Sequence, residues 1–170
     1  MKKLLIISSV ILLIIAAIFI SGQYFGKIYG GGTGNYNIKT KQFKQEDEGK
    51  TISRMVSLKK GIYYYGFPEC PWCQELLPIY NDVLLEQKKK SYVVNTKDTK
   101  LSKHDRKKLS KFYQRYTGDK RLTVPFIVVI KASGQVSTHV GTVTNHDAKK
   151  RKMTAKQKLK LKETLQKLIK

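Results

Sequence analysis

The chain has 170 residues, 41% of them hydrophobic and 27% charged, which suits one folded domain with a core of ordinary size plus a short additional segment. This length excludes a protein of several large domains. The 34 Lys and Arg against 12 Asp and Glu give a net charge of +22. Such a charge implies anionic surroundings, such as membrane headgroups, wall polymers or nucleic acid, and says nothing about the fold.

The N-terminus begins with Met1-Lys2-Lys3, and the 17 residues from Leu4 to Ile20 carry no charge. At about 1.5 Å per residue, a helix of this length is near the lower limit for spanning a bilayer. No small-x-small triplet follows, so residues 1–22 are expected to be an uncleaved single transmembrane helix, with a cleaved signal peptide as the alternative. The basic N-terminus then stays in the cytoplasm, and the rest of the chain faces the extracytoplasmic side of the cell membrane.

Glycine is concentrated between the apolar segment and the remainder of the chain, in the run Gly30-Gly31-Gly32-Thr33-Gly34. Such a run cannot hold regular structure and predicts a flexible tether over residues 23–37. The folded domain is then expected to comprise residues 38–170.

Hydrophobic spacing and turn residues predict eight elements in this domain. They are a helix at 50–60, a strand at 62–65, a helix from 74 to about 87, a strand at 92–94, a helix at 102–116, strands at 126–130 and 136–140, and a last helix to about 168. Thr154 and Gln157 fit a capping box at the start of the last helix. Because helices alternate with strands before a hairpin, this order predicts an α/β sandwich with a mixed central sheet.

The only two cysteines, Cys70 and Cys73, lie between the tyrosine-rich strand and the helix that follows it. A pair of thiols at a strand-to-helix turn is typical of dithiol–disulfide chemistry. The surrounding segment, residues 61–87, contains four carboxylates and no Lys or Arg. This acidic segment is either a solvated surface that arose by chance or a site that prefers positively charged substrates.

Four features in this order resemble the thioredoxin superfamily over about residues 38–170. Cys70-Pro71-Trp72-Cys73 follows a buried strand, Pro78 lies five residues after the second cysteine, Val124-Pro125 precedes a strand, and a hairpin with a terminal helix ends the chain. The resemblance implies a three-layer sandwich behind the transmembrane segment. The apolar N-terminus, short length and many lysines also resemble, more loosely, the membrane-anchored thioredoxin-like bacteriocin accessory proteins of Gram-positive bacteria.

The resemblance assigns roles to the motif residues. Cys70 is expected to be the exposed nucleophile and Cys73 the less exposed thiol that resolves the mixed disulfide. Pro71 suits the first helical turn, because its missing N–H is not needed there. Pro125, if cis, places the Val124 backbone beside the cysteines to pair with an extended substrate; a trans proline at a strand start is the alternative.

Three neighbours of the motif leave the expected chemistry open. Trp72 and Phe67 are expected either to form an apolar rim for substrate or to serve only in packing. Tyr64 occupies the position at which thioredoxins carry a buried aspartate, so no carboxylate is available there as a proton relay. Glu69 is expected to raise the pKa of Cys70, against the lowering effect of the helix N-terminus.

Other interpretations of the motif require partners that the sequence does not supply. Zinc would need two more ligands, and the three histidines, His104, His139 and His146, are not at ligand spacing, so no metal and no cofactor is expected. A purely structural disulfide remains an alternative. Nucleic acid is not expected as a partner, because an exported domain rarely meets it and aromatic residues are not interleaved on the charged faces.

The sequence therefore predicts an extracytoplasmic thiol–disulfide oxidoreductase that forms, reduces or isomerises disulfides through its dithiol. Its expected partners are cysteine-containing exported proteins or peptides, bacteriocins among them, and a redox partner protein. The membrane is contacted through the N-terminal helix, and anionic lipid or wall polymer suits the lysine-rich faces. The alternative function is a non-catalytic thioredoxin-fold module that binds or escorts a secreted peptide at the membrane or wall.

Overall fold

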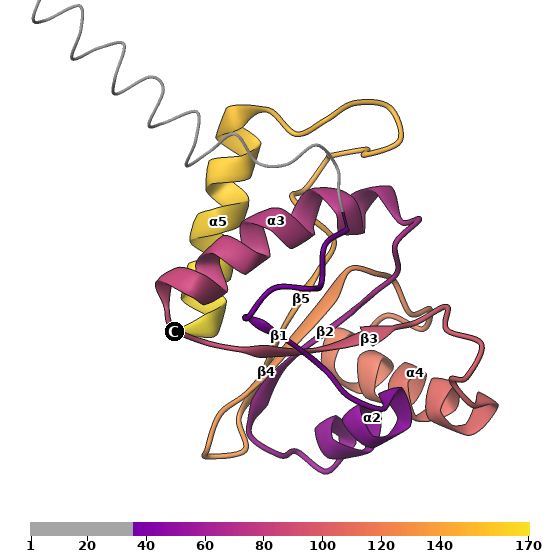
Figure 1. Ribbon diagram of the computed structural model, residues 1–170. Coiled ribbons are helices and arrows are strands. Elements are labelled where there is room, and N and C mark those ends of the chain that lie inside the picture. The colour runs from indigo at the N-terminus through magenta and orange to yellow at the C-terminus, as the bar shows by residue number, and fades with distance from the viewer. Residues whose placement is uncertain (1–35) are drawn as a thin grey trace, which may run out of the picture. The chain divides into compact units, whose positions relative to one another are not determined.

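The computed structural model describes residues 36–170 (Figure 1). The predicted transmembrane helix, residues 1–22, and nearly all of the predicted linker lie outside these described residues. Among residues 36–170, no helix combines the length and the apolar character needed to cross a membrane.

The described chain folds into five strands and four helices in the α/β order that the sequence predicts. The elements are β1 (Phe43–Gln45), α2 (Glu48–Val56), β2 (Gly61–Gly66), α3 (Pro71–Glu86), β3 (Ser91–Asn95), α4 (Lys103–Thr117), β4 (Phe126–Ile130), β5 (Val136–Val140) and α5 (Ala155–Ile169). The predicted capping box is confirmed, because Thr154 and Gln157 exchange hydrogen bonds at the start of α5.

The strands form one mixed sheet in the order β1-β3-β2-β4-β5. β2 is central: it pairs parallel with β3 on one side and antiparallel with β4 on the other. The parallel pairs are joined through helices, whereas β4 and β5 form an antiparallel hairpin. The prediction of an α/β fold with a mixed sheet is thus confirmed.

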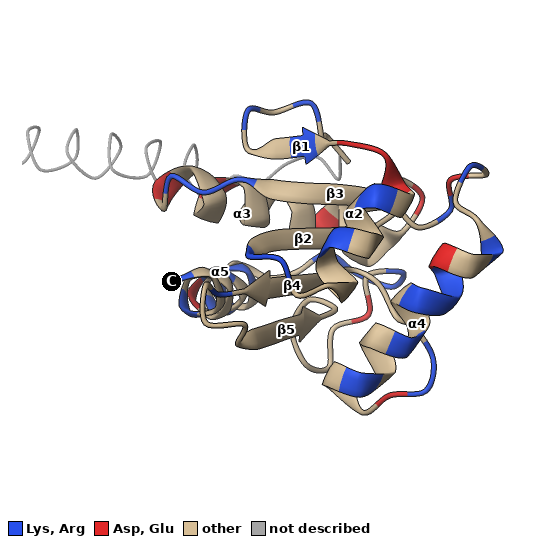
Figure 2. Ribbon diagram, turned by 90° about the horizontal axis from the view of Figure 1, so that it is seen from below, with Lys and Arg blue, Asp and Glu red and all other residues tan. Residues whose placement is uncertain are grey.

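Helices cover both faces of the sheet (Figures 1 and 2). α3 and α5 pack on one face, and α2 and α4 pack on the other. The side chains of β2 alternate between the two cores: Ile62 and Tyr64 face α3 and α5, and Tyr63 and Tyr65 face α2 and α4. The three tyrosines are fully buried, which explains why this strand is hydrophobic at every position.

The sequence-based boundaries differ from the structure at β1, α2 and α3, and α2 also ends at Val56 and not at residue 60. β1 was not predicted, because only Phe43 of its three residues is buried and the strand has no visible alternation. α2 begins earlier than expected, at Glu48, because the Asp47 carboxylate accepts the Lys50 N–H at 2.8 Å and starts the helix there. α3 begins at Pro71, three residues before the start that hydrophobic spacing indicates and in agreement with the place expected for this proline.

Candidate active site

The two cysteines lie at the N-terminal end of α3, directly after β2. Cys70 is the N-cap residue, with φ −79° and ψ 114°, and Pro71 occupies the first helical turn, as expected. The Cys73 N–H points to the Cys70 sulfur, with an N···Sγ distance of 3.3 Å. The Cys70 sulfur therefore occupies the position at which a helix N-terminus stabilises negative charge.

The surroundings of Cys70 lower the pKa of its thiol from 9.0 to about 7. The largest cause is a hydrogen bond from the Cys73 thiol, and burial acts in the opposite direction. The backbone N–H groups of Cys73 and Trp72 and the charge of Lys97 also favour the thiolate. The structure thus decides the competition between the helix N-terminus and Glu69 that the sequence left open.

The sequence predicted an exposed Cys70, and this prediction is wrong: the residue is only 4% exposed. Its thiol donates to the Val124 carbonyl at an Sγ···O distance of 3.8 Å. Cys73 is 0% exposed, so it is the less accessible thiol of the two, as expected. The cysteines are both free thiols.

Sheet topology brings Val124 and Pro125 to the cysteines, although 54 residues separate Cys70 from Val124. β2 ends and β4 begins at the same edge of the sheet, because the two strands are antiparallel and Tyr65 pairs with Phe126. The Val124–Pro125 peptide bond is cis, as the resemblance implied. Val124 is half-buried and Pro125 is buried.

Cys73 has an environment that opposes ionisation. Its interaction with the Cys70 sulfur is the largest cause, and burial the next, of a pKa far above the ordinary value. The pair is therefore asymmetric, with one thiol that ionises near neutral pH and one that holds its proton. The hydroxyl of Tyr64 acts in the opposite direction and lowers the pKa of Cys73.

The Tyr64 hydroxyl lies beside the Cys73 sulfur, above Gly66 at the end of β2. A Cβ atom added to Gly66 would overlap the Tyr64 hydroxyl and would lie 3.0 Å from the Cys73 sulfur. Tyr64 is 0% exposed, and its hydroxyl has no partner of good hydrogen-bond geometry among the described residues. Tyr36 packs against it, with ring centroids 6.3 Å apart, and carries a second buried hydroxyl of the same kind.

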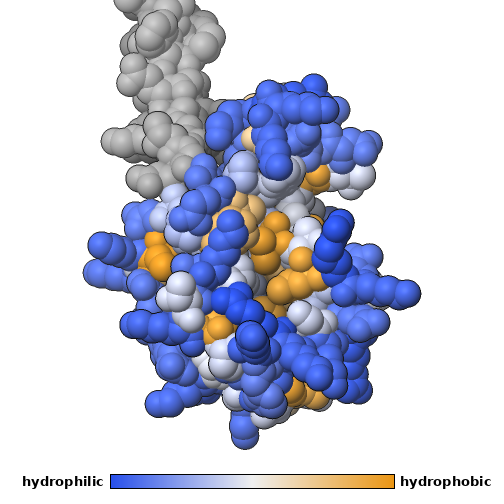
Figure 3. Space-filling model, turned by 90° about the vertical axis from the view of Figure 1, so that its right-hand side faces the viewer, coloured by the Kyte–Doolittle hydropathy of each residue, from blue (hydrophilic) through white to orange (hydrophobic). Residues whose placement is uncertain are grey.

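Two aromatic residues flank the cysteines, and the ammonium group of a lysine lies over the ring of each. The Lys97 Nζ lies 4.0 Å from the Phe67 ring centroid, and the Lys149 Nζ lies 5.9 Å from that of Trp72. Phe67 and Trp72 are each half-buried. Figure 3 shows the face at the N-terminal end of α3, where hydrophobic residues gather in the middle of a hydrophilic surround.

The loop after β5 is fixed to α3 by a buried carboxylate. Glu75 Oε2 lies 3.0 Å from His146 Nε2 and accepts the Met153 N–H at 3.0 Å. The Trp72 indole N–H donates to the His146 carbonyl at 3.3 Å. Sequence reasoning missed this arrangement, since 71 residues separate Glu75 from His146 and no motif links them.

The acidic segment 61–87 is only partly neutralised in the folded domain, because Glu69, next to Cys70, is exposed. Glu75 is buried and also lies 3.8 Å from Lys152, and Glu86 pairs with Lys162 at 2.6 Å. Lys and Arg are spread over α2 and α4 in the folded domain (Figure 2). With the exposed Glu69 beside Cys70 and with Lys97 and Lys149 on the flanking rings, charges of both signs lie at the site, so both interpretations of the acidic segment stay open.

All six predicted site residues lie in one place: Cys70, Pro71, Trp72, Cys73, Val124 and Pro125 surround the start of α3. From the sequence, Tyr64 was of interest only because it stands where thioredoxins have an aspartate, so that no carboxylate is present there. Side chains alternate between the two faces along a strand, and this alternation in β2 is the signal that could have placed the Tyr64 hydroxyl on the α3 side of the sheet. Within residues 36–170, no group of three or more His, Cys, Asp or Glu is arranged to hold a metal ion.

Comparison with protein families and with curated proteins finds no match to this chain. The mixed five-stranded sheet with helices on both faces is compatible with a thioredoxin-like α/β fold. The interpretation of the site therefore rests on its own geometry.

Proposed function

We propose that this protein is a thiol–disulfide oxidoreductase of the thioredoxin superfamily. The observation that carries the proposal is the asymmetry of the pair: a Cys70 thiol with a pKa of about 7 at a helix N-terminus, next to a Cys73 thiol that keeps its proton. An attacking thiol is most effective when its pKa is near the ambient pH. A buried pair with a purely structural role has no need of this difference.

In the reducing direction, the Cys70 thiolate attacks one sulfur of a substrate disulfide. A Cys70–substrate disulfide forms, and the other substrate sulfur leaves as a thiolate that takes a proton from water. The Cys73 thiol then gives its proton to water or to the leaving substrate sulfur, and its thiolate attacks the Cys70 sulfur. The Cys70–Cys73 bond forms as the Cys70–substrate bond breaks, and the second substrate sulfur leaves as a thiolate that takes up a proton. Two electrons pass to the substrate, which leaves with both sulfurs as thiols. The oxidising direction is the reverse of these steps.

The surroundings of the pair suit an extended peptide as the substrate. The Val124 carbonyl, 3.8 Å from the Cys70 sulfur, precedes β4 and offers a backbone group for pairing. Phe67 and Trp72 provide half-buried aromatic surface next to it. Because Cys70 is 4% exposed, a substrate must displace this carbonyl contact to reach the sulfur.

Insulin reduction by the full chain tests the proposal, with Cys70→Ser and Cys73→Ser as paired variants. Loss of turnover in both is expected. Only Cys73→Ser should accumulate a mixed disulfide with the substrate, since it keeps the attacking sulfur and lacks the resolving one. Unchanged turnover in Cys70→Ser would refute the enzyme function. A measured reduction potential near about −270 mV indicates a reductase, and one near about −120 mV an oxidase.

The proposed place of action is the extracytoplasmic face of the cell membrane, where disulfides persist. Support comes from the uncharged run Leu4–Ile20 after two lysines. Exported cysteine-containing peptides, bacteriocins among them, would then be the clients, together with a redox partner protein. Protease treatment of intact cells that carry a C-terminal tag tests the orientation: a protected tag would contradict it.

A further inference from the structure

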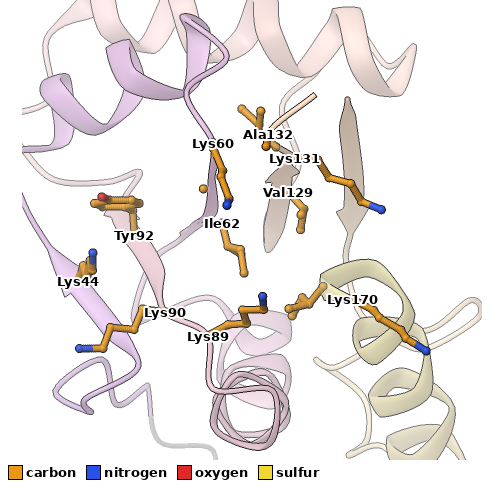
Figure 4. A pocket seen from close by; sticks show the side chains of 13 residues that line it. Lys44, Lys60, Ile62, Lys89, Lys90, Tyr92, Val129, Lys131, Ala132 and Lys170 are labelled. Atoms are coloured by element: carbon orange, nitrogen blue, oxygen red, sulfur yellow. The ribbon is translucent and has the colours of Figure 1, made fainter. Parts of the chain in front are cut away.

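A cavity of about 380 Å³ lies at the end of the sheet opposite the cysteines, where β2 begins and β4 ends (Figure 4). This volume is within the range of small-molecule sites. Three aliphatic side chains that line it lie on the α3 and α5 face of the sheet and are largely buried: Ile62, Val129 and Ile169 are each at most 8% exposed. They give the cavity an apolar floor.

Lysines surround this floor. The six that line the cavity are Lys44, Lys60, Lys89, Lys90, Lys131 and Lys170. Within the described chain, none of the thirteen lining residues is acidic. None of the six lysines forms an ion pair with another residue of 36–170. Lys60 and Lys89 point toward each other across the cavity (Figure 4).

Compensation of helix dipoles accounts for part of this cluster. α3 ends at Glu86 and α5 at Ile169, and cations are favourable near the C-terminal ends of helices. Lys44, Lys60 and Lys131, however, come from β1 and from the residues flanking β2 and β4. Lys60 lies in the connection after α2, but Lys44 and Lys131 do not follow a helix, so helix dipoles do not explain why these two also surround the apolar floor.

The residues that line the cavity indicate which kind of anionic ligand it can hold. Tyr92 also lines it, but its ring stacks on Tyr63 at 5.4 Å, and Lys44 and Arg54 each lie 5.1 Å from its centroid. An aromatic ligand therefore finds no free ring face there. An aliphatic floor within a cationic rim fits an alkyl chain with an anionic head.

We propose that this cavity binds a phosphate-headed lipid, with the phosphate between Lys60 and Lys89 and the alkyl chain over Ile62 and Val129. The site is separate from the cysteines and does not depend on thiol chemistry. It would hold the domain close to a phospholipid surface or retain a lipid monomer.

A photoreactive alkyl phosphate, cross-linked to the full chain and mapped by mass spectrometry, tests the proposal residue by residue. Labelling is expected on the segments around Ile62, Val129 and Ile169. Lys60→Gln with Lys89→Gln should reduce this labelling at least tenfold. Lys107→Gln with Lys120→Gln, which removes the same charge from exposed positions away from the cavity, should change it less than twofold.

Competition with unlabelled compounds shows whether the cavity takes a free alkyl phosphate, a phospholipid in a membrane or inorganic phosphate. Unlabelled alkyl phosphates should compete about fourfold better for each added methylene while the chain remains inside the cavity. Phosphatidylglycerol vesicles that compete without dependence on Lys60 and Lys89 would show that the cavity is not the lipid site. Equal competition by inorganic phosphate, or by an alkyl trimethylammonium of the same length, would also overturn the proposal.

A second inference concerns Tyr64 and rests on the proposed function. Its hydroxyl is buried, has no well-formed hydrogen bond within residues 36–170 and lies beside the sulfur that must ionise in the second step. We infer that Tyr64 is a positioning residue that donates a hydrogen bond to the Cys73 thiolate when that thiolate forms.

Burial raises the pKa of Tyr64 far above its ordinary value, so the phenol keeps its proton and acts as a donor. It does not receive the proton of Cys73, which passes to water or to the leaving substrate sulfur. A buried anion needs such a donor, because burial removes the water that would otherwise stabilise it. The carboxylate at this position in thioredoxins is thereby replaced by a group that works through hydrogen bonding alone.

Tyr64→Phe removes only this hydroxyl, and Tyr65→Phe provides a matched control. Tyr65 is equally buried on the same strand, but its hydroxyl contacts Met55 Sδ at 2.9 Å in the other core. Tyr64→Phe should slow decay of the mixed disulfide by about 10- to 150-fold, the value of a hydrogen bond to a charged group. The first step, measured as Cys70 alkylation, should change less than twofold.

A measurement that needs no enzyme activity separates this inference from the proposed function. In a Cys70→Ala background, Tyr64→Phe should move the alkylation midpoint of Cys73 up by about one to two pH units. Tyr65→Phe should leave it in place. Equal midpoints in the two tyrosine variants would overturn the role of Tyr64, even if the protein proves to be an oxidoreductase.

Discussion

Replacing Cys73 with alanine should raise the pKa of the Cys70 thiol most of the way back to its ordinary value. The hydrogen bond from the Cys73 thiol is the largest cause of the shift from 9.0 to about 7. The difference between a pKa of 9.0 and one of about 7 corresponds to about 2.7 kcal/mol in the free energy between the thiol and the thiolate. At pH 7, about half of Cys70 is then thiolate in the unaltered protein, against about 1% at a pKa of 9, which is a difference of about fiftyfold.

The rate of alkylation by iodoacetamide, followed from about pH 5 to pH 10, measures this thiolate fraction. The unaltered protein should give a midpoint near 7. Cys73→Ala should move the midpoint most of the way toward 9, because the N–H donors of the helix remain. Cys73→Ser keeps a hydroxyl donor at nearly the same place and should give an intermediate value.

Two results would refute this reasoning. A midpoint near 9 in the unaltered protein would mean that the helix N-terminus and Cys73 do not stabilise the thiolate. A midpoint near 7 in Cys73→Ala would mean that the backbone N–H groups and Lys97 alone stabilise the Cys70 thiolate. The hydrogen bond from the Cys73 thiol would then not be the cause of the difference between the two thiols.

Three other substitutions have outcomes that follow from the structure. Gly66→Ala should destabilise the protein by about 1–3 kcal/mol in urea unfolding, because the added Cβ overlaps the Tyr64 hydroxyl; full stability would contradict the close packing. Glu75→Ala leaves the His146 ring and the Met153 N–H without their partner, at about 1–3 kcal/mol each, and should speed proteolysis at residues 147–152. Burial lowers the pKa of His139 below 6.5, so the unfolded state binds more protons and stability should fall as the pH falls below 6.5; His139→Gln should flatten that dependence.

The order of the elements could be predicted from local sequence because each has a local physical cause. Phe126–Ile130 and Val136–Val140 are placed where the hydrophobic pattern and the turn at Gly134 indicate. The capping box at Thr154 is likewise local. β1 could not be found in this way, since its three residues form a strand only because β3 is present to pair with them.

The charges around the candidate site come in part from segments that are distant in the sequence. Residues 61–87 are acidic along the chain. In the folded domain Glu75 and Glu86 meet Lys152 and Lys162 from distant segments, whereas Glu69, next to Cys70, stays exposed. Lys97 follows β3, and Lys149 and Lys152 belong to the loop before α5. Coulomb interactions depend on distance in space, so the set of charges that surrounds the site was decided only when the sheet and this loop were in place.

The sequence by itself determined the chemistry that is available: two thiols at a strand-to-helix turn, a proline for the first helical turn, and a buried strand in front of them. The tertiary structure decided how the two thiols differ. It placed the Val124 carbonyl next to Cys70 through antiparallel pairing of β2 with β4, and it placed the Tyr64 hydroxyl next to Cys73 through the alternation of β2. The acidity of a thiol depends on the groups within a few ångströms of it, and those groups come together only when the chain is folded.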